Sequence, residues 1–332
     1  MRILRPRKID GKLTYCTSPI EYVGKRGCVH LLNQNDLIFL NKLDSFKKEN
    51  ELIDVVQDVN DDISQISLNG EQIKCVINNV YFKVDKGYEL GYQTAEGLAE
   101  ELVSELLDFT DINHASYKSI FIKNDGLAQI GCKSPSFLKK NCMEMRVSTC
   151  LTDNNGIRKP EITQIFKHGT IDECLDITCK YTSKNLHIDY NQVKQYFLKI
   201  IAIDCITENI DRHFDNIIFI KNEDKTIEEG PIFDNGCALK SDPVAYKDLE
   251  SFYNGKIGTS LFLKRFSFDE YADLVSRNHL VIEIDKKYKL YKEKSIEIHH
   301  HKIYDDATFN RLTNLLNQNL IKYEKRGIIK WI

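Results

Sequence analysis

The sequence lacks the features that mark membrane-spanning or signal-bearing secreted proteins. Its 332 residues include no run of 18 apolar residues, the length that a membrane-spanning helix requires. The N-terminus, MRILRPRKIDGKLTYC, is basic but has no apolar stretch of the kind found in signal peptides. We therefore expect a cytoplasmic protein without a membrane partner, or else a secreted effector that carries no signal peptide.

An excess of charge of one sign is also missing. The 46 Lys and Arg residues nearly balance 49 Asp and Glu residues, which leaves a net charge of −3. This balance gives no electrostatic reason for a nucleic-acid-binding surface, so no direct nucleic-acid binding is expected. A hydrophobic content of 42% fits a soluble globular chain, long enough for one large domain or two of ordinary size.

Cysteine is present without a pairing pattern, and proline and glycine are scarce. None of the ten cysteines forms a CxxC pair, and scattered thiols in apolar runs indicate a reducing compartment. Three consecutive His at 299–301 point in different directions without a partner cluster, so we expect a polar surface strand or loop there. Six Pro and 16 Gly, with abundant Ile, Lys and Asn, hint at an AT-rich bacterial coding sequence.

The first half of the chain changes character near residue 63. Residues 1–60 are hard to interpret, although 30–46 could form a helix. Residues 63–132 then predict the order β-β-α-β-β. The first two strands are Lys74–Ile77 and Val80–Val84, joined by an Asn pair that favours a tight turn. A strong helical period follows within 94–112, and two further strands lie within 116–123 and 127–133.

Helices dominate after residue 133. Residues 192–209 are apolar on a broad face and predict a buried helix that stops near Asn209. A short strand at 217–220, a polar loop at 221–230 and a second strand around 232–233 predict a hairpin. Residues 260–326 predict further helices with a Lys-rich surface.

This hairpin carries an acid at each foot. Asp211 precedes the first strand, Asp234 follows the second, and Asn216 lies between them. Buried carboxylates are costly unless they are paired or bind a cation, and two carboxylates with an amide oxygen suit Mg²⁺. The five-residue gap from Asp211 to Asn216 is that of the protein-kinase catalytic loop, in which the Asp accepts the substrate hydroxyl proton.

The upstream half offers the remaining parts of such a site. Lys83 lies on an apolar strand, where a phosphate-positioning Lys is expected, and Glu100 lies on the helix that follows. Glu96 and Glu101 are rivals of Glu100. Glu101 points further from the apolar stripe of the helix, whereas the helical period does not exclude Glu96. The segment SLNG, ending at Gly70, occupies the place of a phosphate-covering loop but is a weak signal alone.

Taken together, these segments resemble the HipA-like serine/threonine kinases, a family of bacterial toxin–antitoxin and effector kinases. The resemblance spans roughly residues 63–245. Its parts are a phosphate loop, a nucleotide-Lys strand, a helix with the paired Glu, a D-x-H-x-x-N catalytic loop and a metal-binding Asp segment. In order, they are SLNGEQIK (67–74), YFKVD (81–85), EGLAEELVSELL (96–107), NIDRHFDN (209–216) and PIFDNG (231–236).

The resemblance implies an α+β, bilobal protein-kinase-like fold. Residues 61–133 would form a small β-rich N-lobe with one main helix, and residues 134–332 a larger, mostly helical C-lobe. Residues 1–60 would be an N-terminal extension of unclear role. The implied activity is that of an ATP- and Mg²⁺-dependent serine/threonine protein kinase, with a protein substrate and an antitoxin as expected partners.

The resemblance also assigns roles to single residues in the second half of the chain. Asp211 would be the catalytic base, and Asn216 and Asp234 would bind Mg²⁺. His213 would lie where many kinases place a Lys that steadies the transferring phosphoryl group. Asp215 stands where many members carry Lys, which makes the local charge more negative.

In the first half, Lys83 would contact the nucleotide phosphates and pair with Glu100. Gly70 would let backbone N–H groups approach the phosphates. The family can autophosphorylate a Ser of this loop and so inactivate itself. Ser67 matches that position, and Ser64 is a nearby competitor.

Three other activities remain open from the residues. A small-molecule phosphotransferase shares the D-x-x-x-x-N and later Asp arrangement. A pseudokinase would bind nucleotide without turnover. A metal-dependent hydrolase needs only Asp and His, but it leaves Lys83 and the phosphate loop unexplained.

Overall fold

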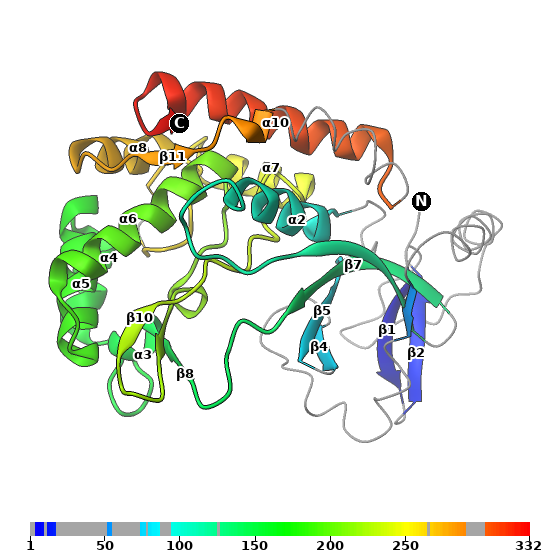
Figure 1. The fold of residues 1–332 in the computed structure, drawn as a ribbon, viewed down its shortest axis with the longest axis horizontal. Helices are drawn as coiled ribbons and strands as arrows, with labels where there is room; N and C mark the ends of the chain where they lie inside the picture. Colours follow the sequence, from blue (N-terminus) through cyan, green and yellow to red (C-terminus); the bar gives the residue numbers. More distant parts are fainter. Residues whose placement is uncertain are drawn as a thin grey trace.

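The computed structural model describes residues 4–9, 12–17, 52–54, 74–77, 79–86, 94–124, 127–263, 266–289 and 303–332. Within them, a sheet-rich part and a mostly helical part lie side by side (Figure 1). Four sequence predictions fall outside the described residues: Ser64, Ser67 and Gly70 of the phosphate loop, the helix at 30–46, the turn residue Asn78, and the His run at 299–301.

The larger sheet has five strands in the order β3-β6-β7-β5-β4. Its members are β3 (Leu52–Asp54), β4 (Lys74–Ile77), β5 (Val80–Val84), β6 (Lys118–Asn124) and β7 (Leu127–Pro135). Neighbours are antiparallel except β3 and β6. The strands predicted between residues 74 and 133 are thus confirmed. Asn79, with φ of 63°, adopts the left-handed conformation that a tight turn needs. Separately, β1 (Leu4–Ile9) and β2 (Lys12–Thr17) pair as an antiparallel hairpin.

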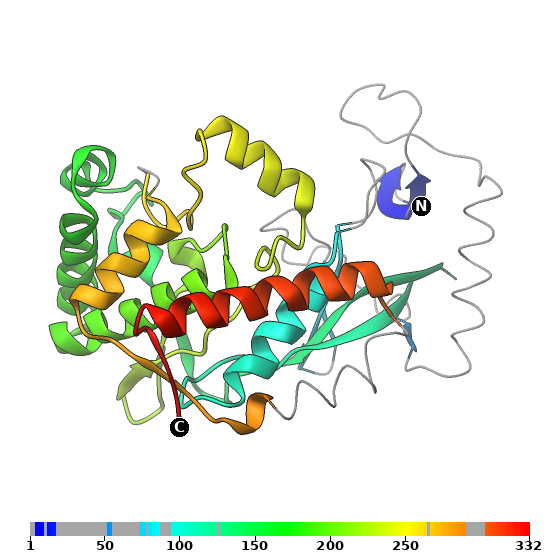
Figure 2. The same cartoon turned by 90° about the horizontal axis from the view of Figure 1, so that it is seen from above.

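Helix α2 (Glu96–Leu107) packs between this sheet and the long helix α10 (Asp306–Lys325), as Figure 2 shows. Buried side chains occupy nearly every position of α2, so both of its faces are covered. Gly97 makes the close approach possible. A Cβ at this position would lie 2.8 Å from the backbone of Gly131 on β7 and 2.7 Å from the Tyr304 hydroxyl. The first helical turn is therefore held against the sheet on one side and the C-terminal region on the other.

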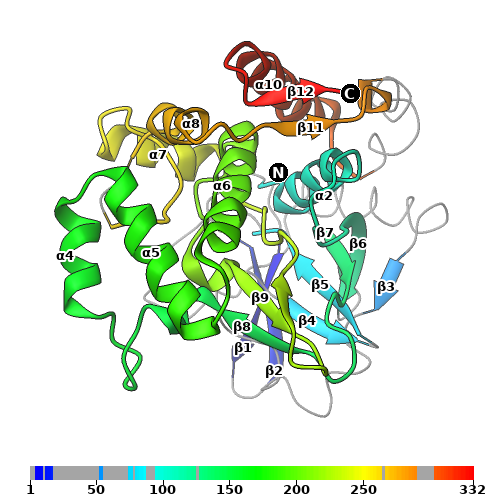
Figure 3. The same ribbon diagram turned by 60° about the vertical axis from the view of Figure 1, so that its left-hand side comes forward.

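The helical part is built around α6 (Tyr190–Thr207), which packs against α5 (Ile171–Leu186), α8 (Phe268–Arg277) and α10 (Figure 3). This confirms the buried helix predicted within 192–209. Asp189 caps its N-terminus by accepting backbone N–H bonds, and Glu208, with φ of 49°, ends it in the left-handed conformation. Three further helices are α3 (Val147–Cys150), α4 (Pro160–His168) and α7 (Pro243–Phe252).

A second sheet has the order β10-β9-β8 and corrects the predicted hairpin. Strand β9 (Ile218–Lys221) pairs with β10 (Ile227–Glu229) and with β8 (Met143–Arg146), a strand that the sequence did not reveal. The prediction placed the second hairpin strand at 232–233, which is wrong. The actual strand is polar because it forms the edge of the sheet.

The apolar residues at 232–233 have a different partner. Ile232 bridges in parallel to His114, with its N–H donating to the carbonyl of Asn113 at 2.8 Å. Ala115 returns a bond of 2.9 Å to the carbonyl of Ile232. The segment that leads to Asp234 is thereby attached to the connection between α2 and β6, next to the larger sheet.

The region 260–326 is helical in large part, as predicted. It also contains β11 (Ile282–Ile284), which pairs in parallel with β12 (Ile329–Trp331). A main hydrophobic core joins α2, α5, α6, α8 and α10. A smaller cluster under the larger sheet contains Ala115, Tyr117 and Cys132, with Phe137 and Phe233 against it.

Candidate active site

Lys83 lies on β5 and brings together two carboxylates from distant parts of the chain. Its Nζ donates to Glu100 Oε1 at 2.5 Å and to Asp234 Oδ1 at 2.7 Å. The ammonium also lies 4.9 Å from the ring centroid of Tyr117. Burial alone would lower the pKa of Lys83, but Asp234 and Glu100 outweigh it and hold that pKa well above its ordinary value. Lys83 is therefore a permanently charged cation inside the protein.

Glu100 is the carboxylate of α2 that reaches this lysine. Its second oxygen, Oε2, accepts the backbone N–H of Asn235 at 2.7 Å. Of its two rivals, Glu96 instead accepts the backbone N–H of Lys86 at 3.1 Å, and Glu101 faces Ser119 on β6. Burial raises the pKa of Glu100, with the Lys83 charge opposing this shift. The structure therefore pairs Lys83 with the residue that the resemblance favoured.

Asp234 occupies a turn between β10 and α7. Its φ of 59° is in the left-handed region, which a residue with a Cβ seldom adopts. The side chain is 21% exposed, whereas that of Glu100 is 1% exposed. One oxygen of Asp234 is thus bound to Lys83 while the carboxylate as a whole keeps access to solvent.

Asp211 lies on the loop that follows α6 and is exposed. Its N–H donates to Asn209 Oδ1 at 3.1 Å, and Ser260 Oγ lies 3.5 Å from its Oδ1. Partial burial of the carboxyl raises the pKa of Asp211; the Asp234 charge adds to this shift, and His213 opposes it. The charge of Asp234 is therefore close enough to act on the Asp211 carboxyl.

His213 and Asn216 belong to the short 3₁₀ turn η2 (Phe214–Asn216) and its cap. The N–H of Asn216 donates to the carbonyl of His213 at 2.9 Å, and Asn216 is buried. Phe214 anchors the turn by stacking on Phe166 of α4, with 5.5 Å between ring centroids. Asp215 lies 3.7 Å from His213 Nδ1 and accepts a bond of 2.5 Å from Ser148 on α3, so it is held toward α3.

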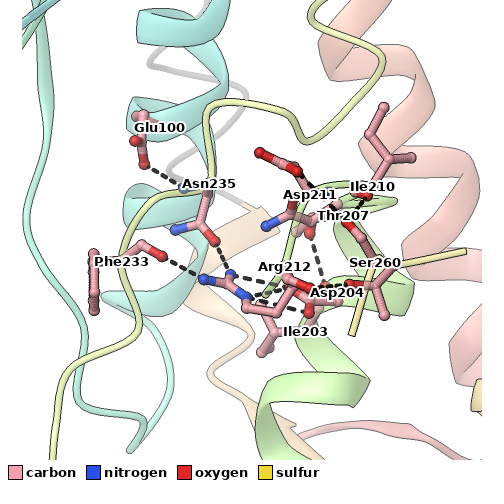
Figure 4. A network of polar contacts seen from close by, with 12 residues as sticks. Glu100, Ile203, Asp204, Thr207, Ile210, Asp211, Arg212, Phe233, Asn235 and Ser260 are labelled. Atoms are coloured by element: carbon pink, nitrogen blue, oxygen red, sulfur yellow. Dashed lines mark hydrogen bonds and ion pairs between the residues drawn. The ribbon is translucent and has the colours of Figure 1, made fainter. Parts of the chain in front are cut away.

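Arg212, next to the proposed base, was not singled out from the sequence. It is fully buried, and its guanidinium bonds Asp204 on α6 at 3.0 Å, the carbonyl of Phe233 at 2.5 Å and Asn235 Oδ1 at 2.6 Å (Figure 4). The signal that could have revealed it is an Arg beside a strongly apolar helix that contains a single acid, Asp204. An unpaired charge of either sign would be costly there.

The donor set fits Mg²⁺ and a polyphosphate better than it fits a transition metal. Within the described ranges, no group of three or more His, Cys, Asp and Glu residues could hold a metal ion alone. Mg²⁺ does not need such a cage, because it keeps waters and uses one or two carboxylates together with substrate phosphates. Asp234 and Asn216 offer the hard oxygen atoms, and Lys83 offers a fixed positive charge beside them.

Comparison with known proteins identifies the fold. No protein-family model matches the sequence, and no curated protein matches it. The crystal structure of a Helicobacter pylori proinflammatory kinase, CtkA, is similar over 78% of this chain and 90% of that chain, with 15% identity and a TM-score of 0.52. The chain therefore has a mixed α/β fold like that of a kinase.

A second similar structure is HipA in the Shewanella oneidensis MR-1 toxin–antitoxin complex with HipB and operator DNA. The similarity covers 95% of this chain and 76% of the HipA chain, with 12% identity and a TM-score of 0.39.

Within the described ranges, no helix is long and apolar enough to cross a membrane.

Proposed function

We propose that this protein is an ATP- and Mg²⁺-dependent serine/threonine protein kinase of the HipA-like type. The observation that carries the proposal is the double contact of Lys83 with Glu100 and Asp234. A lysine fixed by a helix carboxylate and placed beside a second, accessible carboxylate is the arrangement that protein kinases use for phosphoryl transfer from a nucleotide. The kinase-like fold supports the same proposal.

In this proposal, each residue of the site has a distinct role. Lys83 orients the nucleotide phosphates and Glu100 orients Lys83. Asp234 and Asn216 hold Mg²⁺, which when bound neutralises charge on the phosphates. Asp211 accepts the proton of the substrate hydroxyl, and its raised pKa brings it closer to the ideal value for a general base.

The finer parts of the proposal rest on the sequence resemblance. His213 would steady the transferring phosphoryl group. Gly70 and Ser67 would cover the phosphates, with autophosphorylation at Ser67 or Ser64. The bilobal division near residue 133, the protein substrate and an antitoxin partner belong to the same set of expectations.

The test is the intact mass of the purified protein after incubation with Mg-ATP. We expect the wild type to gain phosphate and Asp211→Ala to gain none while still showing ATP-dependent thermal stabilisation. Asp224→Ala, which removes an exposed carboxylate in the β9–β10 turn, is the matched control and should behave like the wild type. Identical behaviour of Asp211→Ala and the wild type would contradict the assigned role.

A panel of small alcohols is incubated in parallel with a panel of proteins. Transfer to the alcohols alone would replace the protein kinase by a small-molecule phosphotransferase. ATP-dependent stabilisation of the wild type without any transfer would replace it by a nucleotide-binding pseudokinase.

A further inference from the structure

The backbone at Asp234 is held from both sides, by Arg212, which lies outside the proposed catalytic set, and by Glu100. The Asp234 φ of 59° lies in the left-handed region, which Asp adopts more readily than most residues but still at a cost, so the surrounding contacts help to hold it. On the N-terminal side, the carbonyl of Phe233 accepts a bond of 2.5 Å from Arg212 Nη1. On the C-terminal side, the N–H of Asn235 donates to Glu100 Oε2 at 2.7 Å. These two bonds fix the peptide groups that flank Asp234.

The two restraints are joined through Asn235. Its side-chain Oδ1 accepts a bond of 2.6 Å from Arg212 Nη2, while its backbone N–H bonds Glu100. One asparagine, which follows Asp234 in the sequence, therefore connects the loop after α6 to helix α2; Figure 4 shows its bonds to Arg212 and Glu100. The side chain of Asn235 is 1% exposed, so its amide oxygen depends on Arg212 for a partner.

Arg212 itself is immobilised by α6. Its Nε lies 3.2 Å and 3.3 Å from the two carboxylate oxygens of Asp204, and its Nη2 lies 3.0 Å from Oδ1. Its own carbonyl accepts a bond of 3.2 Å from Thr259 Oγ1. A planar guanidinium can serve Asp204 with one edge and residues 233–235 with the other, which a lysine ammonium cannot do.

From these contacts we infer that Arg212 and Asn235 are positioning residues, which hold Asp234 in its left-handed conformation and set its place relative to Asp211. The inference rests on the proposed function, since it concerns the metal-binding role of Asp234. The peptide bond between Asp211 and Arg212 makes the coupling direct. The guanidinium that holds residues 233–235 belongs to Arg212, and Arg212 directly follows Asp211, the proposed base.

The consequence is a specific defect when the link through Asn235 is removed. Asn235→Leu has a similar volume but no acceptor for Arg212, so the 233–235 segment loses one of its restraints. We expect Mg²⁺ to bind more weakly, by about tenfold or more, as is typical when a group that orients a metal ligand is lost. The KM for the protein acceptor should stay unchanged, because the acceptor does not contact Asn235 in this proposal.

The experiment compares four proteins: wild type, Asn235→Leu, Asn235→Asp and Asn319→Leu. Asn235→Asp keeps an acceptor for Arg212 and should restore most of the wild-type Mg²⁺ dependence. Asn319→Leu removes a buried amide on α10 that bonds Glu208, and it serves as the matched control. Two quantities are measured: the Mg²⁺ concentration for half-maximal transfer at saturating ATP, and amide hydrogen exchange of peptides covering 231–238 without ligand.

Faster exchange at 231–238 in Asn235→Leu alone, together with the shifted Mg²⁺ dependence, is the expected result. Unchanged exchange and unchanged Mg²⁺ dependence would overturn the inference. If Asn235→Leu does not fold, Arg212→Lys replaces it, since this variant keeps the charge beside Asp204 but cannot reach both partners. Failure of the wild type to transfer phosphate would refute the proposed function, while the exchange data would still decide whether Asn235 holds the segment.

Discussion

Lys83 and Arg212 are both buried cations, but their surroundings differ in charge. Lys83 bonds two carboxylates, those of Glu100 and Asp234. Arg212 faces a single carboxylate, that of Asp204, and otherwise bonds uncharged oxygen atoms. Lys83 thus bonds a second carboxylate that is partly exposed, whereas Arg212 has one buried acid as its counter-charge.

The Lys83 and Arg212 regions also differ in the solvent exposure of their carboxylates. The side chain of Asp234 is 21% exposed, and that of Asp204 is 1% exposed. Burial raises the pKa of Asp204 to about 6, with Arg212 opposing the shift. A ligand can therefore reach the Lys83 region at Asp234, whereas the Arg212 region is closed to solvent. This difference indicates which ion pair serves binding and which serves structure.

The largest expected effect is on phosphoryl transfer, when the second carboxylate at Lys83 is neutralised. Asp234→Asn should lower phosphoryl transfer by about 10³-fold, because it removes a charge that stabilises the metal and the transferring group. Its free energy of unfolding should not fall, since Lys83 keeps Glu100 as a balanced partner. Transfer rates and urea unfolding of the same preparation test both statements. A marked loss of stability in Asp234→Asn would contradict the comparison.

The next largest effect is on the free energy of unfolding, when the ion pair of Arg212 and Asp204 is broken. Arg212→Met should cost about 3–5 kcal/mol in the free energy of unfolding, because Asp204 is left buried without a partner. The double variant Arg212→Met/Asp204→Leu should recover much of this loss. Lys83→Met is the comparison variant and should cost less, because Glu100 keeps the backbone N–H of Asn235 as a partner and Asp234 reaches solvent. Equal losses for the two single variants would show that the two cations play the same structural role.

A third test uses another buried carboxylate near the site, Glu96. Burial raises its pKa from 4.5 to about 7, so the folded protein binds this proton more tightly than the unfolded chain. Stability is therefore lost as the pH rises from 4.5 to 7, by about 3 kcal/mol for a shift of this size. Glu96→Gln should remove this decline and be more stable than the wild type at pH 8, as measured by chemical denaturation.

The control for that test is Glu173→Gln in the capping box of α5. Hydrogen bonds from the backbone N–H and hydroxyl of Thr170 lower the pKa of Glu173. The contribution of Glu173 to the free energy of unfolding therefore grows as the pH rises. The two variants should therefore change the pH dependence in opposite directions. A Glu96→Gln curve parallel to that of the wild type would contradict the assignment.

The smallest effect concerns the contact between Asp85, which follows β5, and Tyr304, which precedes α10. Tyr304 donates a bond of 2.8 Å to Asp85, which also accepts the N–H of Gly97 at 2.7 Å. Tyr304→Phe leaves one buried oxygen without a donor and should cost about 1–2 kcal/mol in chemical denaturation. Tyr181→Phe removes an exposed bond to Glu161 and should cost less than about 0.5 kcal/mol.

Much of the site could be predicted because its residues lie on strongly patterned elements. Lys83 is flanked by apolar residues on a strand, and Glu100 lies on a helix with a clear apolar period. Both were therefore predicted on the elements where they lie. The choice between Glu100 and Glu96 could not be made from the period, because both are buried on a helix that is covered on all sides.

What could not be predicted depends on partners that are distant in sequence. Strand β10 is a polar edge strand, so its composition resembled a loop, and Ile232 pairs with the loop near His114 instead. The role of Arg212 depends on Asn235, 23 residues further on, and on Phe233. No local pattern encodes these contacts, because tertiary packing alone selects them.

The distance along the chain between the members of the site also bears on how the protein is made. Lys83 and Asp234 are 151 residues apart, and Asp85 and Tyr304 are 219 apart. A ribosome that adds about 5–20 residues per second needs roughly 8–30 s to proceed from Lys83 to Asp234. Loop closures of this length form late in folding. A nascent chain therefore carries β5 and α2 for many seconds before Asp234 is available to complete the contact with Lys83.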